Sequence, residues 1–214
     1  MKSGYRSILS LLISLLFLIT GCASTDMTSE ANPDITTHHY ETILAVGYFG
    51  SLELRKDAEN ELCEDIVGDT TTKCIESNSV FFPGETYSAE DTSKKLAALH
   101  VDAVLTIRPI GSGTSSAYIP PTTYATGTAH AYGNTVTGTA TSQTFGGFSV
   151  HKPWENLEIT LYSIADKKIA WYATGQSHGN AHASWDDLIE SAADKCVDKL
   201  LDDGVLQKPS ETKN

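Results

Sequence analysis

The stretch Val101–Ile110 reads VDAVLTIRPI, and it decides which fold the sequence predicts. Most of its residues are apolar, as expected for a strand that is covered on both faces. Upstream of it the chain shows a strand at Thr42–Phe49, a helix at Leu52–Val67 before Gly68, a strand near Thr72–Ser77 and a helix from Ser88 to about Leu99. Because the strands are separated by helices, they favour parallel pairing with right-handed crossovers.

Downstream of that stretch, the chain returns in an antiparallel hairpin and ends in a helix. Asn156–Ile164 alternates apolar and polar residues, Asp166–Lys168 makes a turn, and Ile169–Gly175 pairs back. Ser184 opens the last helix, which ends at Gly204. One face of this helix is a continuous apolar stripe of Trp185, Leu188, Ile189, Ala192, Ala193, Cys196, Val197, Leu200 and Leu201. The predicted class is α/β: three parallel strands with crossover helices, extended by an antiparallel hairpin and a C-terminal helix.

An insertion interrupts this pattern. Pro109–His151 contains no Asp, Glu, Lys or Arg across 43 residues, in a chain that is 20% charged. Gly133-Asn134 suits a two-residue hairpin turn, and pairing outward from it separates small residues from threonines. The small-residue pairs are Ala131–Val136, Ala129–Gly138, Gly127–Ala140 and Ala125–Ser142; the others are Tyr132–Thr135, His130–Thr137, Thr128–Thr139 and Thr126–Thr141.

The alternative for this insertion is a disordered low-complexity loop. The separation of the two faces favours an ordered hairpin, and an uncharged edge invites pairing with another strand. We therefore expect a surface for a protein partner or a second copy, made of Tyr124, Thr126, Thr128, His130, Tyr132, Gly133 and Asn134.

The N-terminus carries a signal for export. Lys2 and Arg6 precede an apolar run, Ile8–Ile19, of 12 residues, which is too short to span a hydrocarbon core. Ile19-Thr20-Gly21-Cys22 follows and resembles the lipobox of bacterial lipoproteins. That resemblance implies removal of residues 1–21 and a diacylglyceryl thioether on Cys22 with palmitate-type acyl chains, which anchors the protein without spanning the membrane. An ordinary secretory signal with a chance cysteine is the alternative.

The residues after Cys22 bear on location. In lipoproteins of enteric-type bacteria an Asp after the cysteine favours the inner membrane; Ala23 and Ser24 stand here, so the resemblance implies the outer membrane, facing the periplasm. The inner membrane and the cell surface are less favoured. The polar segment 22–39 is expected to be a flexible lipidated tether that holds the domain roughly 20–25 Å from the anchor. Residues 40–207 then form one domain with the insertion 109–151, and 208–214 a polar tail.

Charge excludes one class of partner. Loss of residues 1–21 removes Lys2 and Arg6 and leaves 13 basic against 27 acidic residues, a net charge of about −14. Such a surface repels phosphate backbones, so no nucleic acid partner is expected.

Three cysteines remain after Cys22, and an exported protein meets oxidising conditions. Cys63 and Cys74 are the closest pair in sequence and are predicted to form a disulfide, while Cys196 should stay reduced inside the last helix. The spacing of Cys63 and Cys74 fits no strong zinc pattern, and no metal or cofactor is expected.

Two patterns raise enzymatic alternatives. Gly175–Gly179 reads GQSHG and matches a nucleophile elbow centred on Ser177, but no helix follows directly and no His lies downstream of Asp186 or Asp187. His178 and His182 have the spacing of a zinc pair on a helix, although Gly and Asn lie between them. A hydrolase or a metal enzyme is therefore kept only as an alternative.

The element order and the anchor resemble the periplasmic domains of the curli-secretion lipoprotein and of penicillin-binding-protein activator lipoproteins. The curli-secretion protein projects hairpins to build a pore, whereas the small-residue face here lacks the bulky apolar side chains that lipid contact demands. We expect a non-enzymatic envelope lipoprotein that binds partners or assembles with itself. A subunit of an outer-membrane assembly, which predicts rings in detergent, is a further alternative.

Overall fold

The computed structural model describes residues 23–35, 40–132 and 135–209, and it has an α/β fold built on one mixed sheet. The strands lie in the order β1-β8-β7-β4-β2-β3. Their bounds are β1 Ala23–Ala31, β2 Thr42–Gly47, β3 Lys73–Glu76, β4 Ala103–Ile119, β7 Phe148–Ser163 and β8 Lys168–Gly179. β2 runs parallel to β3 and β4, whereas β4, β7, β8 and β1 pair antiparallel in succession.

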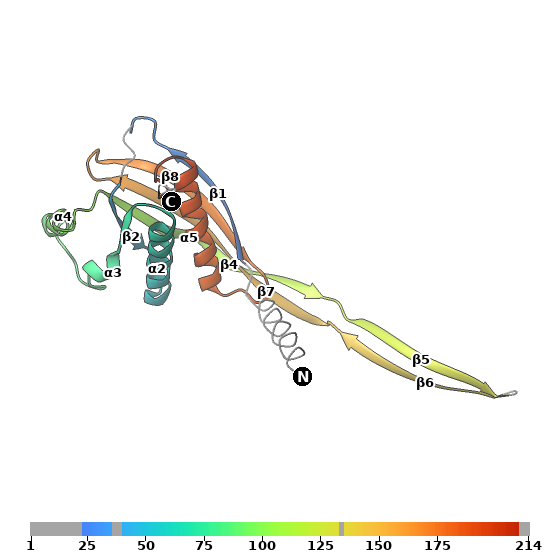
Figure 1. Cartoon of the computed structure of the whole chain (residues 1–214). Coiled ribbons are helices and arrows are strands. Elements are labelled where there is room, and N and C mark those ends of the chain that lie inside the picture. The colour runs from blue at the N-terminus through green and yellow to red at the C-terminus, as the bar shows by residue number, and fades with distance from the viewer. Residues whose placement is uncertain (1–22, 36–39, 133–134, 210–214) are drawn as a thin grey trace, which may run out of the picture.

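Four helices lie in the described part of the chain: α2 Leu52–Asp69, α3 Ser77–Val80, α4 Ala89–Ala98 and α5 Trp185–Asp202. α2 and α5 pack side by side on one face of the sheet (Figure 1). Between them and the sheet lies the main core, where Leu62, Leu105, Ile159, Trp171 and Ile189 are almost fully buried.

The opposite face of the sheet is covered only in part. A smaller apolar cluster around Leu44, Val46 and Val101 fills the space beneath α3 and α4. α4 buries none of its residues. Over β7 and β8, the side chains on this face alternate with the buried ones and remain partly or fully exposed. Among the described residues, this end of the sheet therefore has helices on one side alone.

Local signals for the helices agree with the structure. Ser88 and Ser184 each accept a hydrogen bond from the backbone N–H three residues on, and the Asp187 carboxylate accepts from the Ser184 N–H in return. α2 continues one residue beyond Gly68, and Thr70 closes it by donating its N–H and its hydroxyl to the Ile66 carbonyl. The caps thus lie within a few residues of where sequence placed them.

The expected tether is wrong over most of its length. Ala23–Ala31 forms β1, which pairs antiparallel with β8 from Ala23 opposite Gly179 to Ala31 opposite Trp171. Thr25, Met27 and Ser29 alternate toward the helix side, so the pairing of a sheet edge orders a segment that is too polar to fold alone. The domain therefore starts at Ala23; residues 36–39 lie outside the described residues.

β4 and β7 are much longer than expected and leave the domain together as an arm (Figure 1). β4 continues past Ile110, and a register shift falls between Pro109 and Gly111, because proline has no N–H for the ladder. Beyond Ile119 and Phe148 the arm continues as a second, two-stranded sheet of β5 Thr122–Tyr132 and β6 Thr135–Phe145.

Candidate functional site

The β5–β6 hairpin has the predicted register throughout. Ala125 pairs with Ser142, Gly127 with Ala140 and Thr128 with Thr139, and the same register places Tyr132 opposite Thr135. Gly133-Asn134 lies outside the described residues. Of the predicted contact residues, Tyr124, Thr126 and Thr128 are exposed, and His130 and Tyr132 take their places in the ladder. The expectation of an ordered hairpin is confirmed for 122–132 and 135–145.

Threonine hydroxyls link the two strands at two places. Thr123 and Thr144 lie 2.8 Å apart through their Oγ1 atoms, and Thr128 and Thr139 lie 3.4 Å apart. β5 and β6 pair only with each other in the described structure, so the outer edge of each strand keeps free N–H and C=O groups. A two-stranded ribbon with both faces open is marginal by itself in water, which makes it a candidate contact surface.

A joint separates the hairpin from the rest of the arm. Pro120-Pro121 interrupts one strand opposite Gly146-Gly147 in the other, and both glycines have positive φ, at 94° and 77°. Only glycine adopts such angles at no steric cost, and proline donates no ladder hydrogen bond, so pairing stops here and resumes at Thr122.

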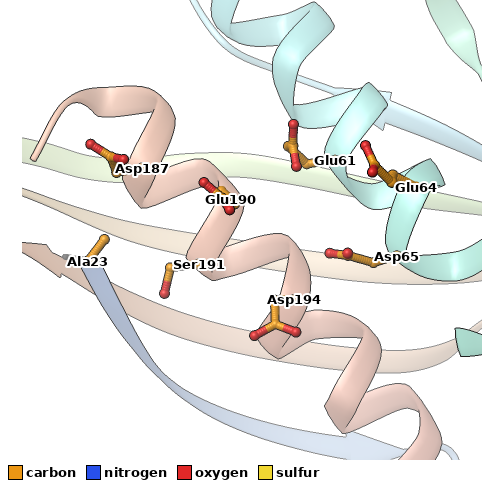
Figure 2. A pocket seen from close by; sticks show the side chains of 8 residues that line it. All are labelled: Ala23, Glu61, Glu64, Asp65, Asp187, Glu190, Ser191 and Asp194. Atoms are coloured by element: carbon orange, nitrogen blue, oxygen red, sulfur yellow. The ribbon is translucent and has the colours of Figure 1, made fainter. Parts of the chain in front are cut away.

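A groove between α2 and α5 is lined almost entirely by carboxylates. Figure 2 shows them spread along the two helices, with Ala23 and Ser191 beside them. They are Glu61, Glu64 and Asp65 on α2 and Asp187, Glu190 and Asp194 on α5. Within the described residues, no three His, Cys, Asp or Glu side chains are placed to hold a metal ion.

Burial and neighbouring negative charge together raise the pKa of one carboxyl in this groove. Burial, followed by the nearby carboxylates of Asp194, Glu61, Asp69 and Glu64, raises the pKa of Asp65 to about 6. Burial also raises the pKa of Glu61. The eight residues that line the groove include no Lys or Arg, so the groove holds a negative potential and repels anionic partners.

The GQSHG pattern is explained by packing. Ser177 lies inside β8, fully buried, with its hydroxyl 2.7 Å from the Thr25 hydroxyl, which in turn donates to Ser191 at 3.0 Å. This chain of hydroxyls joins β8, β1 and α5. A Cβ on Gly179 would approach the Ala183 Cβ to 2.6 Å, so close approach of the following turn requires that glycine. A nucleophile elbow needs a sharp strand-to-helix turn at the serine, and β8 instead continues through Ser177.

The two histidines sit in different settings. His178 is in β8, exposed, opposite Ser24 on one side and Trp154 on the other. His182 is in the connection to α5, where its N–H donates to the Asn180 side chain. The helical spacing that a zinc pair would use is absent between them.

The structure contains the predicted Cys63–Cys74 disulfide, with the two Cα atoms 5.0 Å apart. It ties α2 to β3 across a separation of 11 residues. Cys196 is free and buried, as predicted, and burial raises the pKa of its thiol. Cys22 lies outside the described residues, and none of the described helices has the length and apolar character needed to cross a membrane.

Two buried carboxylates were not singled out from sequence. Glu59 is fully buried and accepts hydrogen bonds from the Gly47 N–H, the Ser77 hydroxyl and the Asn78 N–H and side chain. It organises the β2–α2 and β3–α3 connections. No spacing rule marks it, because it stands next to the apolar stripe and not within a motif.

Glu155 is the second. It is 5% exposed in β7, opposite Ser112 and Ser177, and burial raises its pKa to about 7. The alternation of β7 places Glu155 on the same face as Leu157 and Ile159, so strand periodicity could have located it on the core face. It lies where the arm leaves the domain.

Comparisons with known proteins show similarity of structure only. No protein-family profile matches the chain, and no curated protein matches it in sequence. Among solved structures, a PelC dodecamer from Paraburkholderia phytofirmans aligns at 10% identity with a TM-score of 0.46, over 86% of this chain and 99% of that one. A PDZ domain protein from Parabacteroides distasonis aligns at 10% identity with a TM-score of 0.34, over 89% of this chain and 39% of that one.

Proposed function

We propose that this chain is a lipid-anchored lipoprotein of the cell envelope that acts as a non-enzymatic binding or assembly module, with the β5–β6 hairpin as its contact element. The observation that carries the proposal is the hairpin itself. It projects from the domain, each strand pairs on one side only, and no charged residue lies in it.

Physical chemistry supports a partner for this element. Exposed strand edges are usually protected by charge, by bulges or by a covering element. Here the free strand edges and the Thr hydroxyls offer hydrogen-bonding groups, and no charge in the hairpin repels a partner, while the rest of the mature chain carries about −14. The hairpin is therefore the surface on which another strand can pair at least cost. The partner is a protein or a second copy, not nucleic acid.

The anchor is proposed at Cys22, in the outer membrane and facing the periplasm. It rests on the lipobox-like Ile19–Cys22 and on Ala23 and Ser24 after it. A Cys22→Ala chain should stay as unprocessed precursor or appear in the soluble fraction. Normal processing with unchanged membrane fractionation of this variant would contradict the anchor at Cys22 and the location proposed from it.

The contact role is tested by replacing Pro121–Gly147 with a short Gly-Ser linker. The core strands and α5 lie outside the replaced segment, so thermal unfolding should be unchanged while in-cell crosslinks identified by mass spectrometry disappear. Unfolding of the domain would assign the hairpin to the core; unchanged crosslinks would make it a passive loop.

A charge variant with a matched control sharpens that test. Thr126→Lys with Thr128→Lys adds two charges to the exposed hairpin and should abolish the crosslinks. Ser93→Lys with Ala97→Lys adds the same charge to exposed positions of α4 and should not. Equal loss in both variants would show a general effect of charge rather than a contact at the hairpin. Sizing in detergent then separates self-association from a different partner.

A further inference from the structure

The base of the hairpin carries large apolar side chains that no other described residue covers. Tyr118, Ile119, Tyr124, Phe145 and Phe148, here called the aromatic band, are 63%, 41%, 65%, 60% and 54% exposed. They surround the joint at Pro120-Pro121 and Gly146-Gly147, and the Tyr124 and Phe145 rings touch edge to face at 6.4 Å between centroids. The small-residue face of the hairpin lacks bulky side chains, as expected, whereas the base of the hairpin carries several.

The band lies on both faces of the ribbon. Ile119 pairs with Phe148, so both side chains point to one face, whereas Tyr118 is the preceding residue and points to the other. A flat protein surface would cover one face and leave the other in water. A surrounding medium covers both, and this favours a lipid phase over a single docked protein.

The expected anchor lies at the same end of the sheet. Ala23, which follows Cys22, is the first residue of β1 and pairs with Gly179, while His178 pairs with Trp154. Ala23 is therefore level with Pro153. Phe148, the first residue of β7, lies five residues before Pro153. At about 3.3 Å per residue, Phe148 is on the order of 17 Å beyond the level of Ala23, on the side away from the domain. Because β1 replaces the expected tether, the domain has no slack with which to hold the arm off the membrane.

The arm itself carries no charge that opposes this placement. The arm crosses this region inside Pro109–His151, which contains no Asp, Glu, Lys or Arg. Tyr is enriched at the boundary between head groups and acyl chains, and Phe is a common apolar side chain of segments that lie in that boundary. The free strand edges remain satisfied there because water still reaches that depth.

We infer that the aromatic band is a second membrane contact, which enters the interfacial region of the phospholipid bilayer that holds the Cys22 anchor, so that this region surrounds both faces of the arm at the joint. This inference rests on the proposed lipidation for the position of the bilayer. Two contacts fix the orientation of the domain, whereas an acyl anchor alone leaves it free to rotate. The hairpin tip is then presented at the membrane surface.

The test uses the lipidated full mature chain in vesicles of zwitterionic phosphatidylcholine with brominated acyl chains, which quench nearby tryptophan. Phe148→Trp places a reporter in the band, and Tyr162→Trp places one at an exposed position, 39% accessible, on the same strand far from the anchor. The three native tryptophans contribute equally to both variants. Quenching beyond the unsubstituted protein is expected for Phe148→Trp alone.

Flotation of the same vesicles separates the two proposals. Protein that does not float has no anchor, and the proposed function fails. Protein that floats without extra quenching of Phe148→Trp overturns the inference, as does equal quenching of both variants. A blue-shifted but unquenched Phe148→Trp signal in an oligomer would mean that a second copy covers the band, which also overturns it. In floating protein, Tyr124→Ser with Phe145→Ser should abolish the quenching of Phe148→Trp.

Discussion

The two halves of β4 show how differently the domain and the arm are built from one strand. Ala103, Leu105 and Ile107 are fully buried between the helices and the rest of the sheet. From Ser112 to Ile119 nearly every residue is exposed, although the strand and its pairing with β7 continue. Backbone pairing is therefore the same in both regions, and only the first is covered by a layer of helices.

The comparison also separates charge from burial. The domain's helices carry many charges and still bury one face, and even Glu59 and Glu155 are buried there. The arm has no charged residue in Pro109–His151 and buries almost nothing. A stretch without charge is not evidence of a core, because burial needs side chains large enough to fill space against an opposing layer.

The largest expected difference is between shortening one buried side chain in the domain half of β4 and shortening one exposed side chain in its arm half. Leu105→Ala leaves a cavity in the core and should lower the free energy of unfolding by about 2 to 5 kcal/mol. Ile119→Ala, in the arm, should change it by less than about 1 kcal/mol. Chemical denaturation of the two variants measures both. Similar losses would mean that the arm shares the domain's cooperative core.

A second prediction concerns Glu155, whose pKa of about 7 lies above the unfolded value of 4.5. A carboxyl with a raised native pKa favours folding below the unfolded pKa, and that contribution is lost as pH rises through the native value. Glu155→Gln should therefore stabilise the domain by up to about 3 kcal/mol above pH 7 and by almost nothing near pH 4. Thermal unfolding of the variant and the unsubstituted protein across pH measures this gain. A gain that does not change with pH would contradict the raised pKa of Glu155.

The smallest effect is expected in the acidic groove. Asp65, with its pKa raised to about 6, costs stability once it ionises above that pH. Asp65→Asn should raise the free energy of unfolding at pH 7.5 by about 1 kcal/mol, reduced because solvent and salt screen the groove.

Asp26→Asn, at an exposed position of β1 outside the groove lining, is the control for that variant. Added salt should shrink the part of the Asp65→Asn gain that comes from repulsion between carboxylates and leave Asp26→Asn unaffected. A gain that salt does not alter would assign the raised pKa of Asp65 to burial alone.

Some of these features could be predicted from sequence because their causes are local. The hairpin register follows from a two-residue turn and strict alternation outward from it. Ser88 and Ser184 mark helix starts because a side-chain oxygen satisfies a backbone N–H three residues on. The Cys63–Cys74 pair follows from a short connection between a helix and a strand.

Other features escaped prediction because their causes lie far away in the chain. β1 has only Met27 and alanines as apolar residues, so no sequence pattern predicts a strand, and pairing with β8 supplies the reason. The extension of β4 to Ile119 depends in the same way on β7. The periodicity of apolar residues predicted neither β1 nor the extension of β4, because a weakly apolar segment forms a strand only when it can pair with the edge of another strand.

By itself, the sequence determined the helices α2, α4 and α5, the paired uncharged hairpin and the residues from which an anchor is proposed, since each depends on neighbours within a few turns or one tight turn. Tertiary structure alone decided that six carboxylates face one groove, that Ser177 is a buried hydroxyl and that the aromatic band lies at the anchor's end of the sheet. Those properties arise where elements distant in sequence pack against one another. The local charge, the burial of Ser177 and the position of the band depend on that packing and have no cause in neighbouring residues.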